Sequence, residues 1–521
     1  MDALRRLLPE CPRDPASDTP PVPGRRRFLG DALAGIAASA APVAFARDRL
    51  QPGPQPGLPA AALANSLAHV PGAFGPTPMT IQGRWPAGLQ GVLYRNGPAR
   101  FVRGDTRYRH WFDGDGMVHA FAMGPGGISH RGRMVATTRA GLEQAAGRFL
   151  WDGFGTHFAD ARPTRSPDTL NVANISVLPI GDEVMALWEA GSAWRLDGRS
   201  LQTLGRKTWS PDTDGAPFGA HPRIEPDGRI WNIGYLPGSG KLLVYDISAT
   251  GRLHRSAMLD MPHADMVHDF AMSAHHLVLV LSPLVFERGE GAFGDLLRWQ
   301  PQRGNRIVLI DKDTLTIRAQ YEGEAAFFFH LGNAWEDGDS VRVQVMNQAP
   351  YPALHAAIGQ ATRGLPITPL VPVPASERVI DRRRGTVRDT VLPTGGNEFP
   401  SFDGRHAGRP ARRLVVLGRS ADAPADAFGF DTVQVLDRQT DSVARFAYPR
   451  GVLAEEHLFV ARPGGRDSDG WIVGTHYDSR AHRSGLSVFD AGHVEDGPLA
   501  QVTMPYALPM GLHGRFVAAH G

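Results

Sequence analysis

Short apolar or alternating stretches, separated by clusters of turn residues, make up most of the chain. Clusters such as Pro226-Asp227-Gly228 and Asp467-Ser468-Asp469-Gly470 stand between them, which is typical of strands joined by turns. The predicted strands are Gly91–Tyr94, Met117–Met123, Ser176–Pro179, Glu183–Trp188, Leu242–Tyr245, Leu277–Leu281, Arg306–Ile310, Ser340–Val345, Arg413–Leu417, Thr432–Leu436, Gly470–Thr475 and Leu486–Phe489. This pattern predicts an all-β protein, with helices expected only at Pro352–Arg363 and around Leu142–Arg148.

Three of the predicted strands end in the same way, with an aspartate and then a short turn that contains a threonine. The segments are Val244-Tyr245-Asp246, Leu309-Ile310-Asp311 and Val435-Leu436-Asp437. An aspartate before a turn is common on its own. Its recurrence after about 65 residues, or a multiple of that spacing, favours a propeller of repeated strand units over a sandwich.

Composition and charge fit a folded protein without a nucleic-acid partner. Of the 521 residues, 42% are hydrophobic and 21% are charged, which allows a packed core. The 60 glycines and 43 prolines suit a fold made of strands and turns. The formal net charge is +2 and no basic run interrupts the body of the chain, so the electrostatic footprint of a nucleic-acid-binding protein is missing.

The N-terminus has the form of an export signal. Arg25-Arg26-Arg27-Phe28-Leu29 resembles the twin-arginine motif, and Ala44-Phe45-Ala46 offers small residues to a signal peptidase. The apolar run between them is shorter than the ~20 residues of a membrane span, which disfavours an anchor. We expect residues 1–46 to direct export to the periplasm, residues 47–67 to form a Pro/Gly-rich linker, and residues 68–521 to form a single propeller domain.

The only cysteine, Cys11, lies inside the predicted signal. A mature chain without cysteine contains no disulfide, iron–sulfur cluster or thiolate-bound zinc. Any metal ion must then be held by nitrogen and oxygen atoms.

Four of the 20 histidines stand in unusual surroundings: His221, His268, His330 and His513. They are separated by 47, 62 and 183 residues, and the last separation is close to three times the second. On inner strands of different propeller blades, they can meet on the axis. Four neutral imidazoles suit iron, copper or zinc, and the spacing does not select among these. Taken alone, His330 after the aromatic run Phe327–Phe329 also fits a core histidine bonded to a backbone carbonyl.

Seven ordered motifs, from about Gly83 to the C-terminus, resemble the successive signatures of the carotenoid cleavage oxygenase family. They are R-N-G-P-A at Arg95–Ala99, W-F-D-G-D-G-M-V-H at Trp111–His119, A-L-W-E at Ala186–Glu189, M-V-H-D-F at Met266–Phe270, F-H-L-G-N-A-W-E at Phe329–Glu336, N-E-F-P at Asn397–Pro400 and G-L-H-G at Gly511–Gly514. The family includes apocarotenoid oxygenases, stilbene-cleaving oxygenases and the retinoid isomerohydrolase of the eye. Seven motifs in order are specific, although any single one is weak.

The resemblance implies a seven-bladed β-propeller oxygenase, with loops and short helices capping the face that carries the metal. It also implies that the metal is Fe(II). The four ligands that it implies are the histidines singled out above, His221, His268, His330 and His513.

Three glutamates are implied to support these ligands. By motif they are Glu189, Glu398 and Glu456, each accepting a hydrogen bond from the other ring nitrogen of a histidine. Such an acceptor fixes the tautomer of the ring and raises its basicity as a ligand. Glu456 is chosen over Glu455 because Glu456, Leu458 and Val460 would share one face of a strand.

The implied activity is insertion of O2 into one C=C bond of a carotenoid or apocarotenoid, which gives two carbonyl products. The alternatives are cleavage of a stilbene-type phenylpropanoid, an isomerohydrolase-like reaction, and ligand binding without catalysis. Stilbene-cleaving relatives hold a phenol with a lysine and a tyrosine, and this chain has neither between Met117 and Leu170. We therefore expect an apolar conjugated substrate, with O2 as the second reactant.

Three residues are predicted either to line a substrate tunnel or to pack in the core: Trp188, Phe329 and Ile175. Trp188 and Phe329 adjoin residues implied at the metal. Ile175 ends the segment Ala173-Asn174-Ile175, where the family commonly has threonine. The isoleucine keeps the steric block and loses the hydroxyl.

Two other segments carry open alternatives. Asp113 and Asp115 could serve as acids, but their D-G-D-G stretch is predicted to form a glycine-rich turn. In the helix Pro352–Arg363, the apolar face with Leu354, Ala357 and Ile358 fits either peripheral membrane contact or burial in the core.

Overall fold

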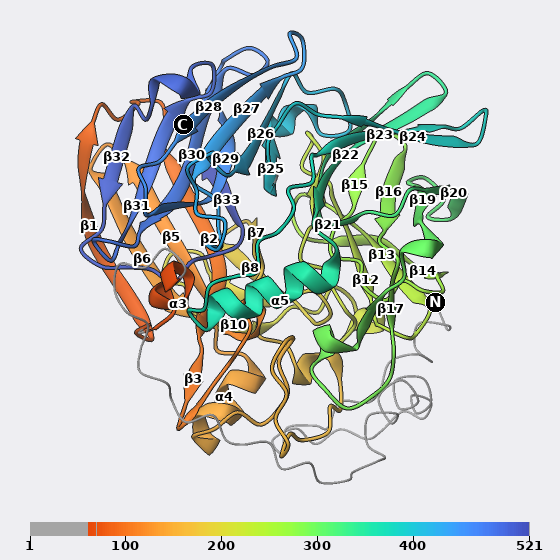
Figure 1. Ribbon diagram of the computed structural model, residues 1–521, viewed down its shortest axis with the longest axis horizontal. Helices are drawn as coiled ribbons and strands as arrows, with labels where there is room; N and C mark the ends of the chain where they lie inside the picture. Colours follow the sequence, from red (N-terminus) through yellow and green to blue (C-terminus); the bar gives the residue numbers. More distant parts are fainter. Residues whose placement is uncertain (1–60, 69, 397, 520–521) are drawn as a thin grey trace.

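The computed structural model describes residues 61–68, 70–396 and 398–519. The predicted export signal, residues 1–46, and residues 47–60 of the predicted linker lie outside the described residues. Strands dominate the described chain, and their sheets stand around a common centre (Figure 1). The prediction of an all-β, propeller-like protein is confirmed.

Five separate four-stranded sheets follow one another along the described chain, and their strands pair antiparallel. Strands adjacent in sequence are neighbours in each sheet, apart from an inserted pair, β17 and β18, between β16 and β19. The strands are β7 Ser176–Ile180, β8 Glu183–Leu187, β9 Trp194–Asp197 and β10 Thr203–Arg206; β11 Arg223–Ile224, β12 Ile230–Tyr235, β13 Lys241–Ile247 and β14 Leu253–Asp260; β15 Ala271–Met272, β16 His276–Leu281, β19 Asn305–Asp311 and β20 Ile317–Gly323; β21 Phe327–Asp337, β22 Ser340–Gln348, β23 Ser376–Asp381 and β24 Thr386–Val391; β25 Glu398–Phe402, β26 Arg413–Gly418, β27 Thr432–Asp437 and β28 Ser442–Ala447.

A sixth, nine-stranded sheet joins the two ends of the described chain. In order it contains β29 Val452–Ala461, β30 Gly470–Asp478, β31 Arg483–Asp490, β32 Ala500–Thr503, β1 Ala73–Gly83, β6 Gly127–Met134, β5 Asp115–Gly124, β2 Gly91–Arg100 and β33 Gly514–Ala518. Strand β1 is shared, because its second half pairs with β32 and its first half with β6. Figure 1 shows β1 beside β32. With five separate four-stranded sheets and one continuous sheet in the described chain, the count of seven blades stays a prediction.

The remaining elements in the described chain are short. Two-stranded pairs are formed by β17 Leu284–Phe286 with β18 Leu297–Trp299 and by β3 Val102–Arg103 with β4 Thr106–Arg107. The α-helices are α3 Ala62–Ser66, α4 Thr138–Ala146 and α5 Tyr351–Thr362. Helix α4 begins four residues before the predicted Leu142, since the Thr137 hydroxyl accepts a hydrogen bond from the Ala140 N–H and caps it.

Each predicted strand lies within a strand of the structure to within one residue. Asp311 and Asp437 end the third strand of their sheets and Asp246 is the last residue but one of its strand, so all three stand at the turn into the fourth strand. At one of these turns the Asp311 carboxylate accepts hydrogen bonds from the N–H groups of Asp313 and Thr314, at 3.0 and 2.8 Å. The carboxylate thus satisfies backbone donors that the turn leaves unpaired.

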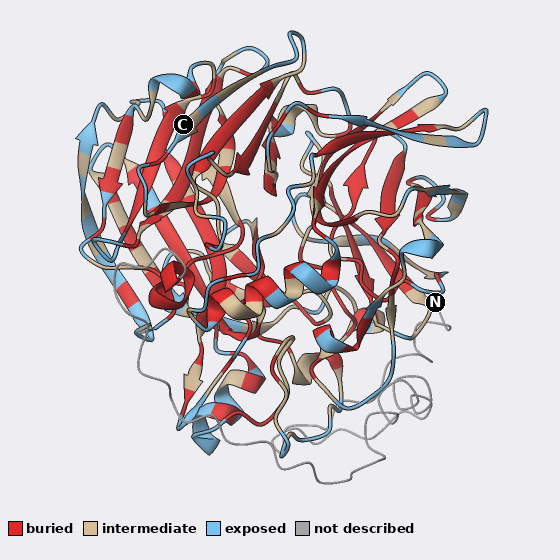
Figure 2. Cartoon of the chain, in the orientation of Figure 1, coloured by how far each residue is buried: buried red, intermediate tan, exposed pale blue. Residues whose placement is uncertain are grey.

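Burial differs between the inner and outer strands (Figure 2). Strand β16, His-Leu-Val-Leu-Val-Leu, is buried along its whole length. By contrast β24, the fourth strand of the β21–β24 sheet, is exposed except for one half-buried residue. A strand buried on both faces reads as a continuous apolar run. The rigid core therefore surrounds the inner strands, on which the candidate site is built.

The linker prediction is wrong at its C-terminal end. Residues 61–67 carry α3, where Ala62, Leu63 and Leu67 are buried and the helix packs against α5. The proline-rich composition ends before this segment, and its apolar side chains gain more from burial than from staying in water.

Helix α5 settles the choice between membrane contact and burial for its apolar face. Leu354, Ala357 and Ile358 are all buried, at 6%, 1% and 3% exposure, in the same core cluster as α3. This face is part of the core. No helix of the described chain is both long enough and apolar enough to span a membrane.

Candidate metal centre

The four histidines lie in or just before edge strands of four different sheets. His221 precedes β11, His268 precedes β15, His330 lies in β21 and His513 precedes β33. The sheets converge on the centre of the ring, so these side chains meet although they are far apart in sequence. One ligand atom from each of the four lies within 4.8 Å of the others.

The imidazole rings face one another through their Nε2 atoms. The Nε2 atoms of His221 and His268 are 3.1 Å apart, and those of His268 and His330 are 3.3 Å apart. The His513 ring centroid lies 4.7 Å from that of His221 and 4.6 Å from that of His330. Four nitrogen atoms thus surround one small volume.

Three glutamates hold three of these rings from behind. Glu189 Oε2 lies 3.1 Å from His268 Nδ1, and Glu456 Oε1 lies 2.8 Å from His513 Nδ1. Glu398 bonds to His330 Nδ1. A proton on each Nδ1 leaves the Nε2 lone pair free and pointing into the cluster. Among the described residues, no carboxylate is paired with His221.

Burial and the neighbouring glutamates have opposite effects on the pKa values of the histidines. Burial, aided by the neighbouring rings, lowers the pKa of His221 well below its usual value. Burial also acts to lower the pKa of His330, but attraction to Glu398 raises it overall. Burial would raise the pKa of Glu456, yet the adjoining His513 keeps it below its usual value. The carboxylate is therefore ionised beside a ring that it polarises.

The donor set fits a divalent cation of borderline softness. Four nitrogen atoms converge, no thiolate is present, and the carboxylates behind them supply negative charge without entering the cluster. Such sets suit iron, cobalt, copper or zinc rather than calcium or magnesium, which prefer oxygen ligands. His221, His268, His330 and His513 would hold the ion.

An apolar cavity of about 170 Å³ reaches the cluster at His268. The three predicted tunnel residues, Trp188, Phe329 and Ile175, all line it. The Phe329 ring lies 5.1 Å from the His268 ring. Residues that sequence reasoning missed also line the cavity, including Phe112, Phe154, Tyr235, Met266, Phe286, Phe293 and Leu512.

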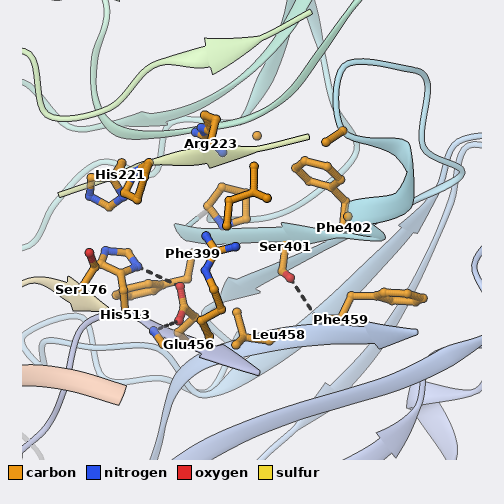
Figure 3. A pocket seen from close by; sticks show the side chains of 18 of the residues that line it. Ser176, His221, Arg223, Phe399, Ser401, Phe402, Glu456, Leu458, Phe459 and His513 are labelled. Carbon is orange, nitrogen blue, oxygen red and sulfur yellow. Dashed lines mark hydrogen bonds and ion pairs between the residues drawn. The ribbon is translucent and has the colours of Figure 1, made fainter. Parts of the chain in front are cut away.

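A second cavity, of about 440 Å³, reaches the cluster at His221, His330 and His513. Its wall is more polar and includes Arg223 and Glu456, as Figure 3 shows. Arg223 is bound to Asp269 at 2.7 Å. The cluster is therefore reached from two cavities of different polarity, and the apolar one suits a hydrocarbon.

Two predictions for single residues have different outcomes. Glu456 bonds to His513, whereas Glu455 accepts from the Gly511 N–H at 2.5 Å. The D-G-D-G stretch, predicted as a glycine-rich turn, connects two elements, because Asp113 ends a 3-10 helix, Trp111–Asp113, and Asp115 begins β5. Both aspartates are buried, Asp113 against the Thr156 hydroxyl and Asp115 against Arg103.

Known proteins match this chain over nearly the whole described region. The family model described as retinal pigment epithelial membrane protein matches residues 68–518. Apocarotenoid-15,15'-oxygenase of Synechocystis sp. is 30% identical over 455 residues, which cover 83% of this chain and 91% of that protein. Isoeugenol monooxygenase of Pseudomonas putida is 27% identical, covering 84% and 93%.

The fold has a close match among solved structures. The crystal structure of cobalt-substituted Synechocystis ACO superposes with a TM-score of 0.77 at 24% identity, and covers 88% of this chain and 99% of the other. The match to the family model and the identity to the Synechocystis oxygenase establish the relationship. The chain belongs to the carotenoid cleavage oxygenase family, whose model carries the description retinal pigment epithelial membrane protein.

Proposed function

We propose that the protein is a non-haem Fe(II) dioxygenase that cleaves one C=C bond of a carotenoid or apocarotenoid. Both atoms of O2 enter the products, one in each new carbonyl group, so no cosubstrate is needed for balance. The observation that carries the proposal is the convergence of one ring nitrogen from each of four histidines beside an apolar cavity. When bound, Fe(II) supplies the redox chemistry that lets O2 react with a double bond.

The side chains of the site have three roles. His221, His268, His330 and His513 would bind the ion through Nε2. The glutamates behind them keep the Nδ1 proton in place and orient the rings. The aromatic wall excludes water and aligns an extended apolar chain, which confines the reaction to the bond held nearest the cluster.

Ile175 links this wall to the cluster. Its side chain lines the apolar cavity, and its carbonyl oxygen accepts a hydrogen bond from the His513 N–H at 3.2 Å. The side chain offers only hydrocarbon to the substrate. Its bulk limits how close a substrate carbon can come, and it supplies no hydroxyl to the reacting atoms.

The cavity favours a polyene over a phenolic substrate. Among the described residues that line it, none is a lysine and one, Tyr235, is a tyrosine. The Tyr235 hydroxyl already donates to Glu189. Cleavage of a phenylpropanoid is the second candidate, because isoeugenol monooxygenases are among the relatives.

Product analysis tests the substrate class. The iron-loaded protein should convert apocarotenals to shorter aldehydes and leave hydroxystilbenes and isoeugenol unchanged. With 18O2, and with the aldehydes trapped before they exchange with water, each product should carry one labelled oxygen. Turnover of the phenolic substrates alone would contradict the polyene assignment, and unlabelled products would point to an isomerohydrolase-like reaction.

We also propose the number of blades and the route of export. The nine-stranded sheet corresponds to two blades joined by β1, one with β29–β32 and one with β2, β5, β6 and β33, which brings the count to seven. An experimental structure with fewer than seven blades around the centre would contradict this. Residues 1–46 direct export through the twin-arginine route, and an antibody signal confined to the cytoplasmic fraction would refute it.

A further inference from the structure

Tyr235 forms a continuous path to one of the four histidines. It is the last residue of β12, is 3% exposed, and lines the apolar cavity. Its hydroxyl donates to Glu189 Oε1, while the other carboxylate oxygen, Oε2, lies 3.1 Å from His268 Nδ1. Glu189 therefore bridges the Tyr235 hydroxyl and the His268 ring.

The three glutamates of the site are held in different ways. Glu456 Oε2 accepts from the Gly514 N–H at 2.6 Å, and Glu398 Oε2 accepts from the Phe399 N–H at 2.9 Å. Both contacts involve backbone, which a substitution does not remove. Within the described chain, Glu189 alone of the three is held by another side chain besides its histidine.

Glu189 is also the only one of the three glutamates that lies outside a strand. It lies in the turn after β8, whereas Glu398 and Glu456 lie within strands β25 and β29. Its side chain is 14% exposed, against 8% for each of the other two. Without a partner for Oε1, this carboxylate would be free to rotate at the cavity wall, and the hydrogen bond to His268 would weaken.

We propose that Tyr235 is a positioning residue, which holds the Glu189 carboxylate and thereby sets the orientation and basicity of His268 at the metal centre. The inference rests on the proposed metal-binding function of the cluster. Acceptors behind a ligand histidine typically change metal affinity by about 10- to 100-fold. Tyr235 acts one step further out, so we expect an effect near the lower end of that range.

The test compares Tyr235→Phe with Tyr245→Phe. Tyr245 lies in the neighbouring strand β13 and is fully buried, and its hydroxyl donates to the Pro217 carbonyl at 2.7 Å rather than to a glutamate of the site. Each substitution removes one buried phenol hydroxyl from the same sheet. Co(II) is the probe, because its visible spectrum reports ligand geometry. Tyr235→Phe should weaken Co(II) binding roughly tenfold and shift the spectrum, whereas Tyr245→Phe should do neither.

A double-mutant cycle with Glu189→Ala shows whether Tyr235 acts through Glu189. In the Glu189→Ala background, Tyr235→Phe should have no further effect on Co(II) affinity. An undiminished effect there, equal weakening by Tyr245→Phe, or wild-type affinity and spectrum in Tyr235→Phe would each overturn the inference while leaving the metal centre intact. If the wild-type protein itself fails to bind Co(II), both the inference and the proposed function are wrong.

Discussion

Two groups of side chains in the described chain are close enough together to hold a metal ion, and they differ in what else touches them. One is the four-histidine cluster; the other contains Asp403, His406 and Asp467. In the second group, Arg405 binds both carboxylate oxygens of Asp403 at 2.6 to 3.0 Å. His406 Nε2 bonds to Asp467 at 3.0 Å.

The difference lies in which atoms are left free. In the histidine cluster the outer nitrogen atoms of His268, His330 and His513 are bonded to glutamates, and the inner nitrogen atoms face one another. In the Asp403 group a guanidinium occupies the oxygens that a cation would need, and a fixed positive charge stands beside the site. Proximity alone therefore does not make a metal site. The side chains must be oriented by partners on their far atoms, and the ligand atoms themselves must be free of other partners.

The strongest test of this comparison is the removal of a ligand. His330→Ala should abolish metal binding and product formation, with at least a 100-fold loss of affinity, because losing a ligand exceeds the roughly 10- to 100-fold loss from an outer partner. Iron content by mass spectrometry and aldehyde yield measure it. A variant that keeps iron and activity would remove His330 from the proposed ligand set.

Removal of a supporting carboxylate should have the next largest effect. Glu456→Gln should weaken metal binding by about 10- to 100-fold, because the His513 ring loses its charged acceptor. Glu455→Gln is the matched control, since Glu455 is equally buried in the same strand and contacts the Gly511 N–H instead. Equal losses in the two variants would mean that burial, rather than contact with His513, explains the effect.

Much of the fold and of the cluster could be predicted because local patterns carry the information. Asp311 marks the end of a strand through hydrogen bonds to residues two and three positions later. His268, His330 and His513 each stand in one of the seven motifs, His221 lies outside them in unusual surroundings of its own, and a ring of sheets brings the four positions together. For these residues, neighbours in sequence and one general feature of the fold are enough.

Other features depend on contacts that no local pattern encodes. Tyr235 meets Glu189 across 46 residues, and nothing around it in sequence marks it as part of the site. The choice of Glu456 over Glu455 relied on strand alternation, but β29 has an irregular register between Ala454 and His457, and both glutamates are buried. Glu456 is the supporting residue because its carboxylate, and not that of Glu455, reaches His513.

A smaller effect is expected from the cavity wall. Phe329→Ala should lower kcat/KM for an apocarotenal and cost about 3–5 kcal/mol of stability, because a buried ring that packs against His268 and Phe112 leaves a void. Metal content should stay near that of wild type. Phe327, in the same strand, does not line the cavity. Phe327→Ala should therefore lower stability with less effect on kcat/KM.

The smallest effect is expected in the Asp403 group. His406→Ala should leave iron content and aldehyde yield unchanged, because the imidazole already bonds to Asp467 and no open ligand set exists there. The pair is partly exposed, so unfolding in urea should shift by no more than about 1 kcal/mol. Loss of a bound metal ion from His406→Ala, with His330 intact, would show that a carboxylate bonded to arginine can still bind a cation, and the contrast between the two groups would then fail.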